Sequence, residues 1–266
     1  MNGLIKMVHY LNNNDLEETY SKIIIYIINN RERISSMNIS DFSNVCYVST
    51  ATISRFSKFF GYPSFQAMKI DLQKSPTFEY TLRLSRSEYH RLNDAPDNLF
   101  LSLGNQIIEG VNDTLQTVDL AEIDRLLEEI MKYDKVYLFG YDSTLDILKK
   151  FQSTFLNNDK LLVMAFPSNL QLELSKKLDN NSLCIVVSSY GTFFTKLPDT
   201  IWNISNSNAK KIFITQGTAN IFTSIFDQII SISTKPNPIT GNFCMDFFFE
   251  YLGKRSLELF SSKHHK

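Results

Sequence analysis

Small polar side chains and two cations gather in one short stretch of the sequence, residues 49–58. They are Ser49, Thr50, Ala51, Thr52, Ser54, Arg55 and Lys58. Hydroxyl groups and cations bind phosphate oxygens, arginine pairs with guanine edges, and small side chains allow a close approach to base pairs. At the start of a helix, this combination is typical of a recognition helix in the DNA major groove. Together with Ser40 upstream, these residues are the candidate DNA-binding residues.

The flanking residues predict the helix that would carry this surface. Ser49 suits the residue before the first turn, because its hydroxyl accepts a hydrogen bond from an unpaired backbone N–H. Gly61 suits the left-handed residue that follows the last turn. An apolar stripe with spacing i, i+3 and i+7 lies on the opposite face and consists of Ile53, Phe56 and Phe60. A short helix precedes this one, so residues 40–61 predict two helices joined by a tight turn.

Two further helices complete a bundle over residues 1–75. A helix is predicted for Asp15–Asn30, in which Asp15 and Glu18 resemble a capping box. Its apolar face consists of Leu16, Tyr20, Ile23, Ile24 and Ile27. Ser64 predicts the start of another helix, which buries Phe65, Met68 and Leu72. We therefore expect a helical domain at residues 1–75, followed by a polar, proline-bracketed linker at residues 76–98.

Residues 99–266 predict an α/β domain. Five short apolar runs lack polar alternation, as strands buried on both faces of a sheet should. They are Val136–Phe139, Leu161–Phe166, Leu183–Val187, Lys211–Thr215 and Gln228–Ile232. Helices are expected before, between and after them, at Leu99–Thr117, Asp119–Tyr133, Leu145–Phe155, Leu170–Leu178 and Phe243–Phe260. Strands that alternate with helices form a parallel sheet, so the fold class is a helical bundle followed by a five-stranded parallel α/β domain.

Three of the predicted strands end in loops rich in hydroxyl groups and glycine, and the third of these loops contains Thr215, Gly217 and Thr218. The candidate ligand-binding residues are Gly140, Ser143 and Thr144 after one strand, and Ser188, Ser189, Gly191, Thr192 and Thr195 after another. Ligands of open α/β sheets bind at the carboxyl ends of the strands, and hydroxyls beside helix N-termini suit a phosphate or another small anion. The same residue types also cap helices and form turns, so both interpretations stay open.

Composition excludes several classes of protein. The formal net charge is −1, with a net charge of +2 in residues 1–75, so charge alone neither favours nor excludes nucleic acid. The three cysteines have no metal-ligand spacing and no disulfide pattern, so we expect no metal and no cofactor. No apolar run is long enough to span a bilayer and no signal peptide is recognisable. These observations predict a cytoplasmic protein without a membrane association.

The motifs of the first domain resemble the helix-turn-helix of RpiR-type transcriptional regulators. The resemblance rests on Ile39–Phe42, Val48–Phe56 and Phe60–Tyr62. The second domain is similar to the sugar isomerase (SIS) domain of these regulators, which binds phosphosugars in many members. The resemblance implies a double-stranded DNA operator, a phosphosugar effector, control of carbohydrate metabolism genes, and a homodimer or homotetramer associated through the SIS domain and the final helix.

Three positions depart from the SIS pattern. Asp142 stands where the family has the second glycine of its first loop. Tyr190 and Phe193 stand where the second loop has a serine and a threonine. Hydroxyl groups of the expected anion site are thus lost and a negative charge is gained, so the effector is either changed or absent.

Two alternatives to a regulator that responds to a phosphosugar stay open. A sugar-phosphate isomerase would need a general base near the pocket, but all four histidines lie outside the predicted sheet. Glu173 and Glu250 are the remaining candidates, and nothing in the sequence places them at the loops. We expect no catalytic residues and no enzyme activity. The other alternative is a regulator whose SIS domain serves only for oligomerisation.

Overall fold

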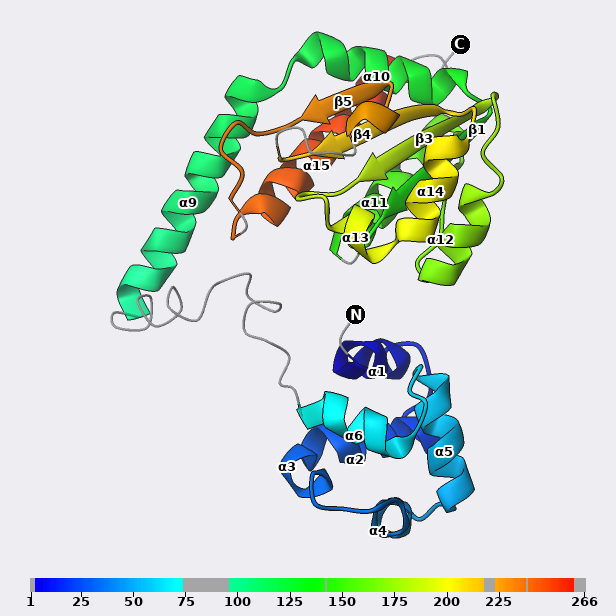
Figure 1. The fold of residues 1–266 in the computed structure, drawn as a ribbon. Coiled ribbons are helices and arrows are strands. Elements are labelled where there is room, and N and C mark those ends of the chain that lie inside the picture. The colour runs from blue at the N-terminus through cyan, green and yellow to red at the C-terminus, as the bar shows by residue number, and fades with distance from the viewer. Residues whose placement is uncertain (1–2, 74–95, 142, 218–222, 238, 261–266) are drawn as a thin grey trace. The chain divides into compact units, whose positions relative to one another are not determined.

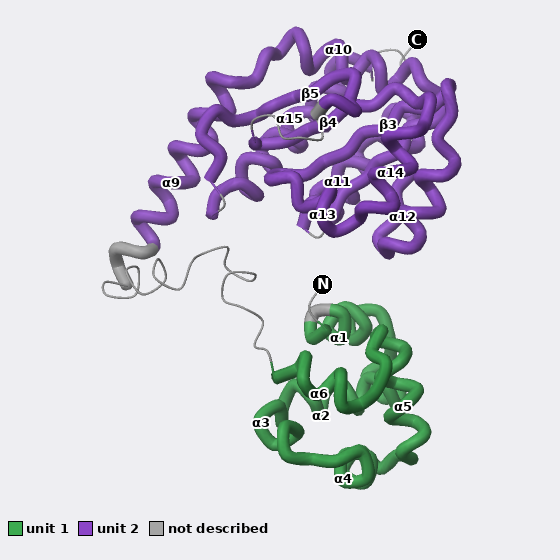
Figure 2. Tube along the Cα trace, viewed as in Figure 1, with its two compact units in different colours: residues 1–89 green, residues 90–266 purple. Residues whose placement is uncertain are grey.

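The computed structural model describes residues 3–73, 96–141, 143–217, 223–237 and 239–260. The chain divides into two compact units, residues 1–89 and 90–266 (Figure 2). Most of the predicted linker, residues 76–95, lies outside the described residues. Each unit is described by itself below.

Unit 1 consists of short helices, coloured blue to cyan in Figure 1. They are α1 (Gly3–Leu11), α2 (Thr19–Asn29), α3 (Arg31–Ile34), α4 (Ile39–Val45), α5 (Thr50–Phe59) and α6 (Phe65–Gln73). Side chains from all six helices share one apolar core that includes the fully buried Met7, Ile24, Phe42, Phe56 and Met68. The structure confirms the predicted helical bundle and adds α1 and α3, which the sequence pattern did not reveal.

The start predicted for the helix Asp15–Asn30, which is α2 in the structure, is wrong. The helix begins at Thr19 rather than Asp15, and Glu18 at its N-cap makes no side-chain capping bond. The Asp15 carboxylate instead accepts a hydrogen bond from the Glu17 backbone N–H at 2.9 Å. An aspartate that bonds two residues ahead stabilises a turn in competition with the helix. Leu16 is therefore 55% exposed and does not belong to the buried stripe.

Unit 2 contains a parallel sheet of five strands in the order β2-β1-β3-β4-β5. The strands are β1 (Lys135–Gly140), β2 (Leu162–Met164), β3 (Ser182–Val187), β4 (Lys210–Thr215) and β5 (Gln228–Ser231). All five agree with the predicted apolar runs. The fold class is confirmed as a helical domain followed by a parallel α/β domain.

Helices cover both faces of this sheet (Figure 1). They are α10 (Leu120–Lys132), α11 (Ser143–Phe155), α12 (Ser168–Ser175), α13 (Thr192–Lys196), α14 (Pro198–Asn206) and α15 (Gly241–Phe260). The helix α9 (Pro96–Thr117) packs against α15. Side chains alternate along each strand: Val136 and Leu138 pack with α10, α11 and α15, whereas Tyr137 and Phe139 pack with α13 and α14. Both faces of the strands are buried, as their unbroken apolar runs predict.

The predicted helix Leu170–Leu178 is only partly correct. The helix α12 ends at Ser175, and its buried residues are Gln171 and Ser175, whereas Leu170 is 49% exposed. Gln171 is buried because its side-chain amide bonds both backbone groups of Gly140. Since β2 pairs with β1 only as far as Leu138, this amide takes the place of the missing ladder partner.

Candidate nucleic-acid interface and anion site

Local hydrogen bonds fix the two helices of the predicted helix-turn-helix. Asn38 caps α4, since its side-chain oxygen accepts from the Ser40 and Asp41 backbone N–H groups at 2.8 and 2.9 Å. The Asp41 carboxylate accepts from the Asn38 N–H at 3.3 Å, which completes a capping box. Ser40 is exposed at the start of α4.

The second helix, α5, has the predicted cap and the predicted stripe. The Ser49 hydroxyl accepts from the Thr52 N–H at 3.1 Å and lies 2.9 Å from the Thr52 hydroxyl. Ile53 and Phe56 are fully buried. Ser57 is also fully buried, and its hydroxyl donates to the Ile53 carbonyl at 3.0 Å. The buried side of α5 is thus anchored to the core of unit 1, which fixes the direction of its other side.

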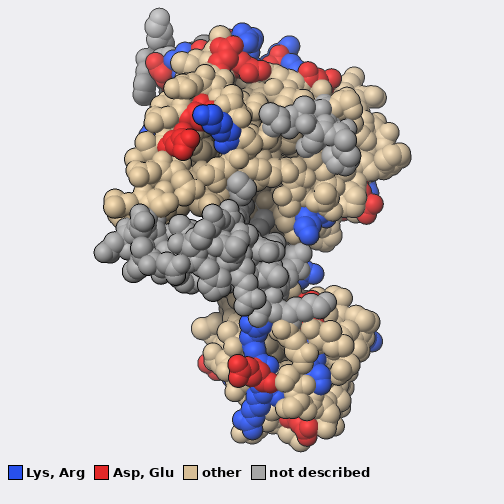
Figure 3. All heavy atoms as spheres, turned by 60° about the vertical axis from the view of Figure 1, so that its left-hand side comes forward, with Lys and Arg blue, Asp and Glu red and all other residues tan. Residues whose placement is uncertain are grey.

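The other side of α5 faces solvent. Thr50, Ala51, Arg55 and Lys58 are exposed, and Thr52 and Ser54 are half-buried. Within the described part of the chain, Arg55 and Lys58 take part in no ion pair and no side-chain hydrogen bond. Both cations are therefore available to an external anion. On the face drawn in Figure 3, lysines and arginines lie beside acidic side chains in each unit, so no extended basic patch is visible there.

In unit 2, the predicted ligand residues lie at the carboxyl ends of the neighbouring strands β1 and β3, where Gly140 pairs with Val187. Thr144 is 4% exposed. Its hydroxyl donates to the Tyr141 carbonyl at 2.7 Å and accepts from the Tyr141 N–H at 2.9 Å. A Cβ atom on Gly140 would lie 2.8 Å from the Thr144 hydroxyl, so glycine is needed for this close approach. The Thr144 hydroxyl thus holds its own loop together.

The loop after β3 is stabilised in a similar way. Ser188 is buried, and its hydroxyl accepts from the Phe193 N–H at 3.2 Å. The Phe193 side chain is fully buried among the aromatic residues of the core on the α13 and α14 face. Gly191 adopts a left-handed conformation with φ 73°. Thr192 and Thr195 are exposed, whereas Ser189 is buried and its hydroxyl has no partner among the described residues.

Tyr190 and Gln216 fill the space between this loop and the start of α15. The Tyr190 hydroxyl donates to the Gln216 side-chain oxygen at 3.2 Å. The Gln216 amide nitrogen donates to the Gly241 carbonyl. A Cβ atom on Gly241 would lie 2.4 Å from the Tyr190 hydroxyl oxygen, which shows how closely the groups pack. The role of Gln216 was missed in the sequence, although its position directly after β4 was a usable signal.

Four further candidate residues belong to unit 2: Asp142, Ser143, Glu173 and Glu250. Asp142 lies outside the described residues. Ser143 lies at the start of α11, with its hydroxyl 3.4 Å from the Asn242 side-chain oxygen. Glu173 and Glu250 pair with lysines, and hydrogen bonds from Lys150 and Lys254 lower the pKa of Glu250. Among the described residues, no cluster of three or more His, Cys, Asp or Glu side chains suits a metal ion.

Comparison with known proteins identifies the first unit. Residues 3–77 match the helix-turn-helix domain of the rpiR family. Unit 1 is therefore similar to the helix-turn-helix domains of this family. An HTH-type transcriptional regulator encoded in the aarA 3' region of Providencia stuartii is 21% identical over 175 residues. The match covers 65% of this chain and 61% of that protein, which is less than two thirds of its length.

Solved structures identify the fold of the chain. The Vibrio vulnificus NanR protein, complexed with ManNAc-6P, has a TM-score of 0.53 at 14% identity, with 98% of this chain and 94% of that chain covered. A Listeria monocytogenes protein assigned as a sugar-phosphate isomerase has a TM-score of 0.50 at 15% identity, with 69% of this chain and all of that chain covered. The α/β fold of unit 2 is thus similar to the fold of these proteins.

No helix among the described residues is long and apolar enough to cross a membrane. The three cysteines are free thiols. Cys184 and Cys244 are buried, and Cys46 is half-buried. Burial raises the pKa of the Cys46 thiol to about 11, so this thiol is protonated at neutral pH.

Proposed function

We propose that this chain is a transcriptional regulator that binds double-stranded DNA through α5 and acts in the cytoplasm. One observation carries the proposal: the buried side of α5 is fixed to the core, while its opposite side presents small polar groups and two cations without partners in the described chain. The rpiR-type domain and the HTH-type relative support it.

Each candidate residue then has a role. Arg55 contacts a phosphate or a guanine edge, and Lys58 contributes a second positive charge one turn later. Thr50, Ala51 and Ser54 approach the bases closely because their side chains are short. Ser49 and Thr52 hold the start of the helix, and their hydroxyls, with Ser40 on α4, can also meet the DNA backbone.

DNA binding is tested with the full chain and two sets of duplexes, from DNA flanking its own gene and from a random library. Gel-shift titrations at increasing salt should reveal a duplex that is bound far more tightly than unrelated DNA. Affinity should fall linearly with salt on logarithmic axes, because phosphate contacts release counterions. Equal affinity for all duplexes, together with turnover of a hexose phosphate, would contradict the proposal and favour an enzyme.

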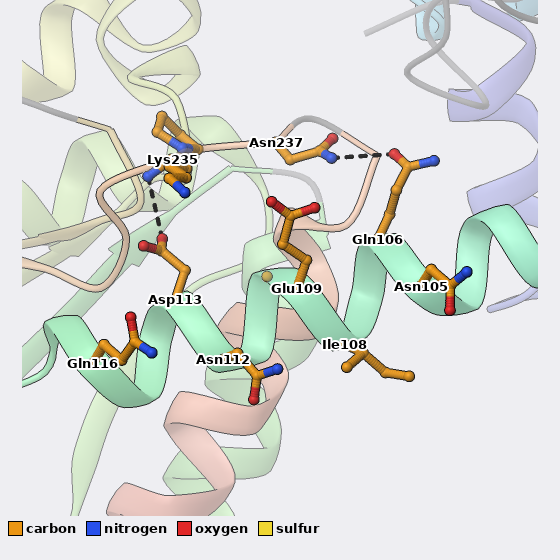
Figure 4. Close-up of a pocket in the computed structure, with 11 residues that line it drawn as sticks. Asn105, Gln106, Ile108, Glu109, Asn112, Asp113, Gln116, Lys235 and Asn237 are labelled. Carbon is orange, nitrogen blue, oxygen red and sulfur yellow. Dashed lines mark hydrogen bonds between the residues drawn. The ribbon is translucent and has the colours of Figure 1, made fainter.

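The proposed assembly is a homodimer or a homotetramer, since one helix-turn-helix contacts too few bases for a specific site. The helix α9 supports association, because Leu101, Ile108 and Leu115 recur every seven residues and are each about 60% exposed. Figure 4 shows Ile108 on the side of α9 away from Lys235 and Asn237. On α15, Phe243 is 48% exposed, which also supports association. Changing Ile108 to Lys should shift the mass measured by sedimentation toward the monomer.

The proposed effector is a phosphosugar or a related small anion at the carboxyl ends of β1 and β3, and the proposed targets are carbohydrate metabolism genes. The N-termini of α11 and α15 and the buried Ser189 hydroxyl support an anion site. NanR binds ManNAc-6P on a similar fold. Here, a ligand must first displace the Tyr190–Gln216 contact, which lowers its affinity.

A thermal-shift screen of sugar phosphates tests this effector, because a ligand that binds the folded state raises the melting temperature. The Tyr190→Ser variant should respond at lower ligand concentrations than the wild type, since serine removes the ring and keeps a hydroxyl. An effector must also change the affinity for DNA if it favours one arrangement of the assembly. No response from either protein to any compound would favour a unit that serves only for oligomerisation.

A further inference from the structure

The turn between α4 and α5 contains a tyrosine in a conformation that favours glycine. Tyr47 has a φ of 54°. Its N–H donates to the Asn44 carbonyl at 3.1 Å, and the Val48 N–H donates to the Ser43 carbonyl at 3.0 Å. These two bonds define a Schellman motif that ends α4, with Tyr47 at the left-handed position.

The next helix ends in the same motif but with glycine. Gly61 has a φ of 86°, and its N–H donates to the Lys58 carbonyl at 2.9 Å. The Tyr62 N–H donates to the Ser57 carbonyl at 2.9 Å. In a left-handed residue, a Cβ atom crowds the following carbonyl oxygen, which is why this position is usually glycine. The helix α5 follows this preference with Gly61, whereas α4 departs from it with Tyr47.

The Tyr47 side chain makes no contact in the described part of unit 1 that offsets the cost of its left-handed backbone. The Tyr47 side chain is 95% exposed, and it has no hydrogen bond or ring contact within the described residues. Other tyrosines of this unit behave differently. The Tyr62 hydroxyl donates to the Asp71 carboxylate at 2.6 Å, and the Tyr20 ring packs edge-on against Phe56. A glycine at position 47 would therefore suit the fold of unit 1 at least as well.

The position of Tyr47 indicates what the ring contacts. Tyr47 lies two residues before Ser49, which caps α5, so its side chain leaves the chain beside the end of α5 that carries the candidate DNA-binding residues. Tyrosine hydroxyls are among the groups that donate to DNA phosphates. The left-handed backbone fixes the direction in which the Cβ atom leaves the turn, so the ring is held outward before any partner binds.

We propose that Tyr47 is a DNA-contacting residue that positions α5. Its ring lies against the sugar–phosphate backbone at the edge of the major groove, and its hydroxyl donates a hydrogen bond to a phosphate oxygen. This inference rests on the proposed DNA binding. The contact fixes the orientation of α5 and carries no sequence information, because every nucleotide offers the same phosphate.

The test uses the full chain, the preferred duplex of the wild type, and the variants Tyr47→Gly, Tyr47→Phe and Arg55→Ala. Tyr47→Gly should weaken DNA binding about tenfold while the melting temperature stays equal or rises by a few degrees. Tyr47→Phe should weaken binding about threefold or more with an unchanged salt slope, since the lost group is neutral. Arg55→Ala should reduce the salt slope by about 1.

The outcomes separate this inference from the proposed function. If the wild type prefers no duplex, both fail. If Arg55→Ala weakens binding while Tyr47→Gly binds like the wild type, the role of Tyr47 is wrong and DNA binding stands. A lower melting temperature for Tyr47→Gly would show that the fold needs the ring, and a changed base preference for Tyr47→Phe would show a base contact. Either result overturns the proposed phosphate contact.

Discussion

Two regions of this chain place hydroxyl-rich sequences at the starts of helices, and the structure uses them in opposite ways. At α5, Thr50 and Arg55 are exposed, and the described residues offer Arg55 no ion pair. At the ends of β1 and β3, Thr144 and Ser188 are buried and hydrogen-bonded within their own loops. At α5 the side chains of Thr50 and Arg55 are open to a partner, whereas the hydroxyls of Thr144 and Ser188 stabilise their own loops. An exposed hydroxyl at a helix start is therefore stronger evidence of a binding site than one that is buried and bonded within its own loop.

The largest loss of stability is expected from a substitution in the core that supports α5. Phe56 is fully buried and contacts Tyr20 and Phe60. Phe56→Ala should cost unit 1 about 3–5 kcal/mol and abolish DNA binding, because a cavity replaces the ring. Hydrogen exchange should show faster exchange in residues 19–59 and unchanged exchange in β1 and β3. Equal loss of protection in both units would contradict the separation of their cores.

A matched pair of threonines compares the two regions directly. Thr144→Ala should destabilise the protein by about 1–3 kcal/mol, because two backbone groups of Tyr141 lose a buried partner. Thr50→Ala should change stability by less than about 0.5 kcal/mol, since the side chain is exposed, while it weakens DNA binding. Chemical denaturation and gel shifts measure the two quantities. A large loss of stability for Thr50→Ala, or none for Thr144→Ala, would reverse the comparison.

A smaller loss of stability is expected from a substitution at Asp113 on α9. Its carboxylate accepts hydrogen bonds from the chain after β5 (Figure 4). Burial alone would raise the pKa of Asp113, but hydrogen bonds from Ser233, Thr234 and Lys235 outweigh it and lower the pKa to about 2. Because the pKa is lower in the folded chain, the stabilisation is complete above about pH 4 and is lost as the pH falls toward 2.

Asp113→Asn should therefore be less stable than the wild type by about 1–2 kcal/mol at pH 7. The difference should shrink between pH 4 and pH 2, because the carboxyl group of the wild type is then protonated. Denaturant titrations of both proteins across this range measure it, and other acidic groups cancel in the comparison. A difference that does not depend on pH would show that the carboxylate charge does not fasten α9.

The sequence predicted the elements whose residues carry a local signal. All five strands were found because each is an unbroken apolar run, and the ends of α5 were found because Ser49 and Gly61 are strong caps. The short helix α13 was missed, because it has no apolar period of its own and packs by two phenylalanines. The turn at Asp15 was misread because an aspartate before a helix can cap it or form a turn.

For the candidate binding residues too, the sequence predicted the exposed side of α5 but not the packing of the loops in unit 2. The buried stripe of α5 followed from helical spacing, so the exposed side followed too. For the loops of unit 2, the sequence could not show whether the hydroxyls are exposed, since this depends on groups far apart in the chain. The contact between Tyr190 and Gln216 is one example, and the closeness of Gly241 to both is another. Long-range packing therefore decides whether the loops can bind a ligand.

The most direct measurement is the affinity of the full chain for its preferred duplex across a salt series, with Arg55→Ala compared to Arg33→Ala. Both arginines are exposed in unit 1, and both variants remove one positive charge. If α5 binds DNA, Arg55→Ala lowers the affinity at least about tenfold and reduces the salt slope by about 1, while Arg33→Ala stays close to the wild type. Equal affinities for the two variants would contradict the account.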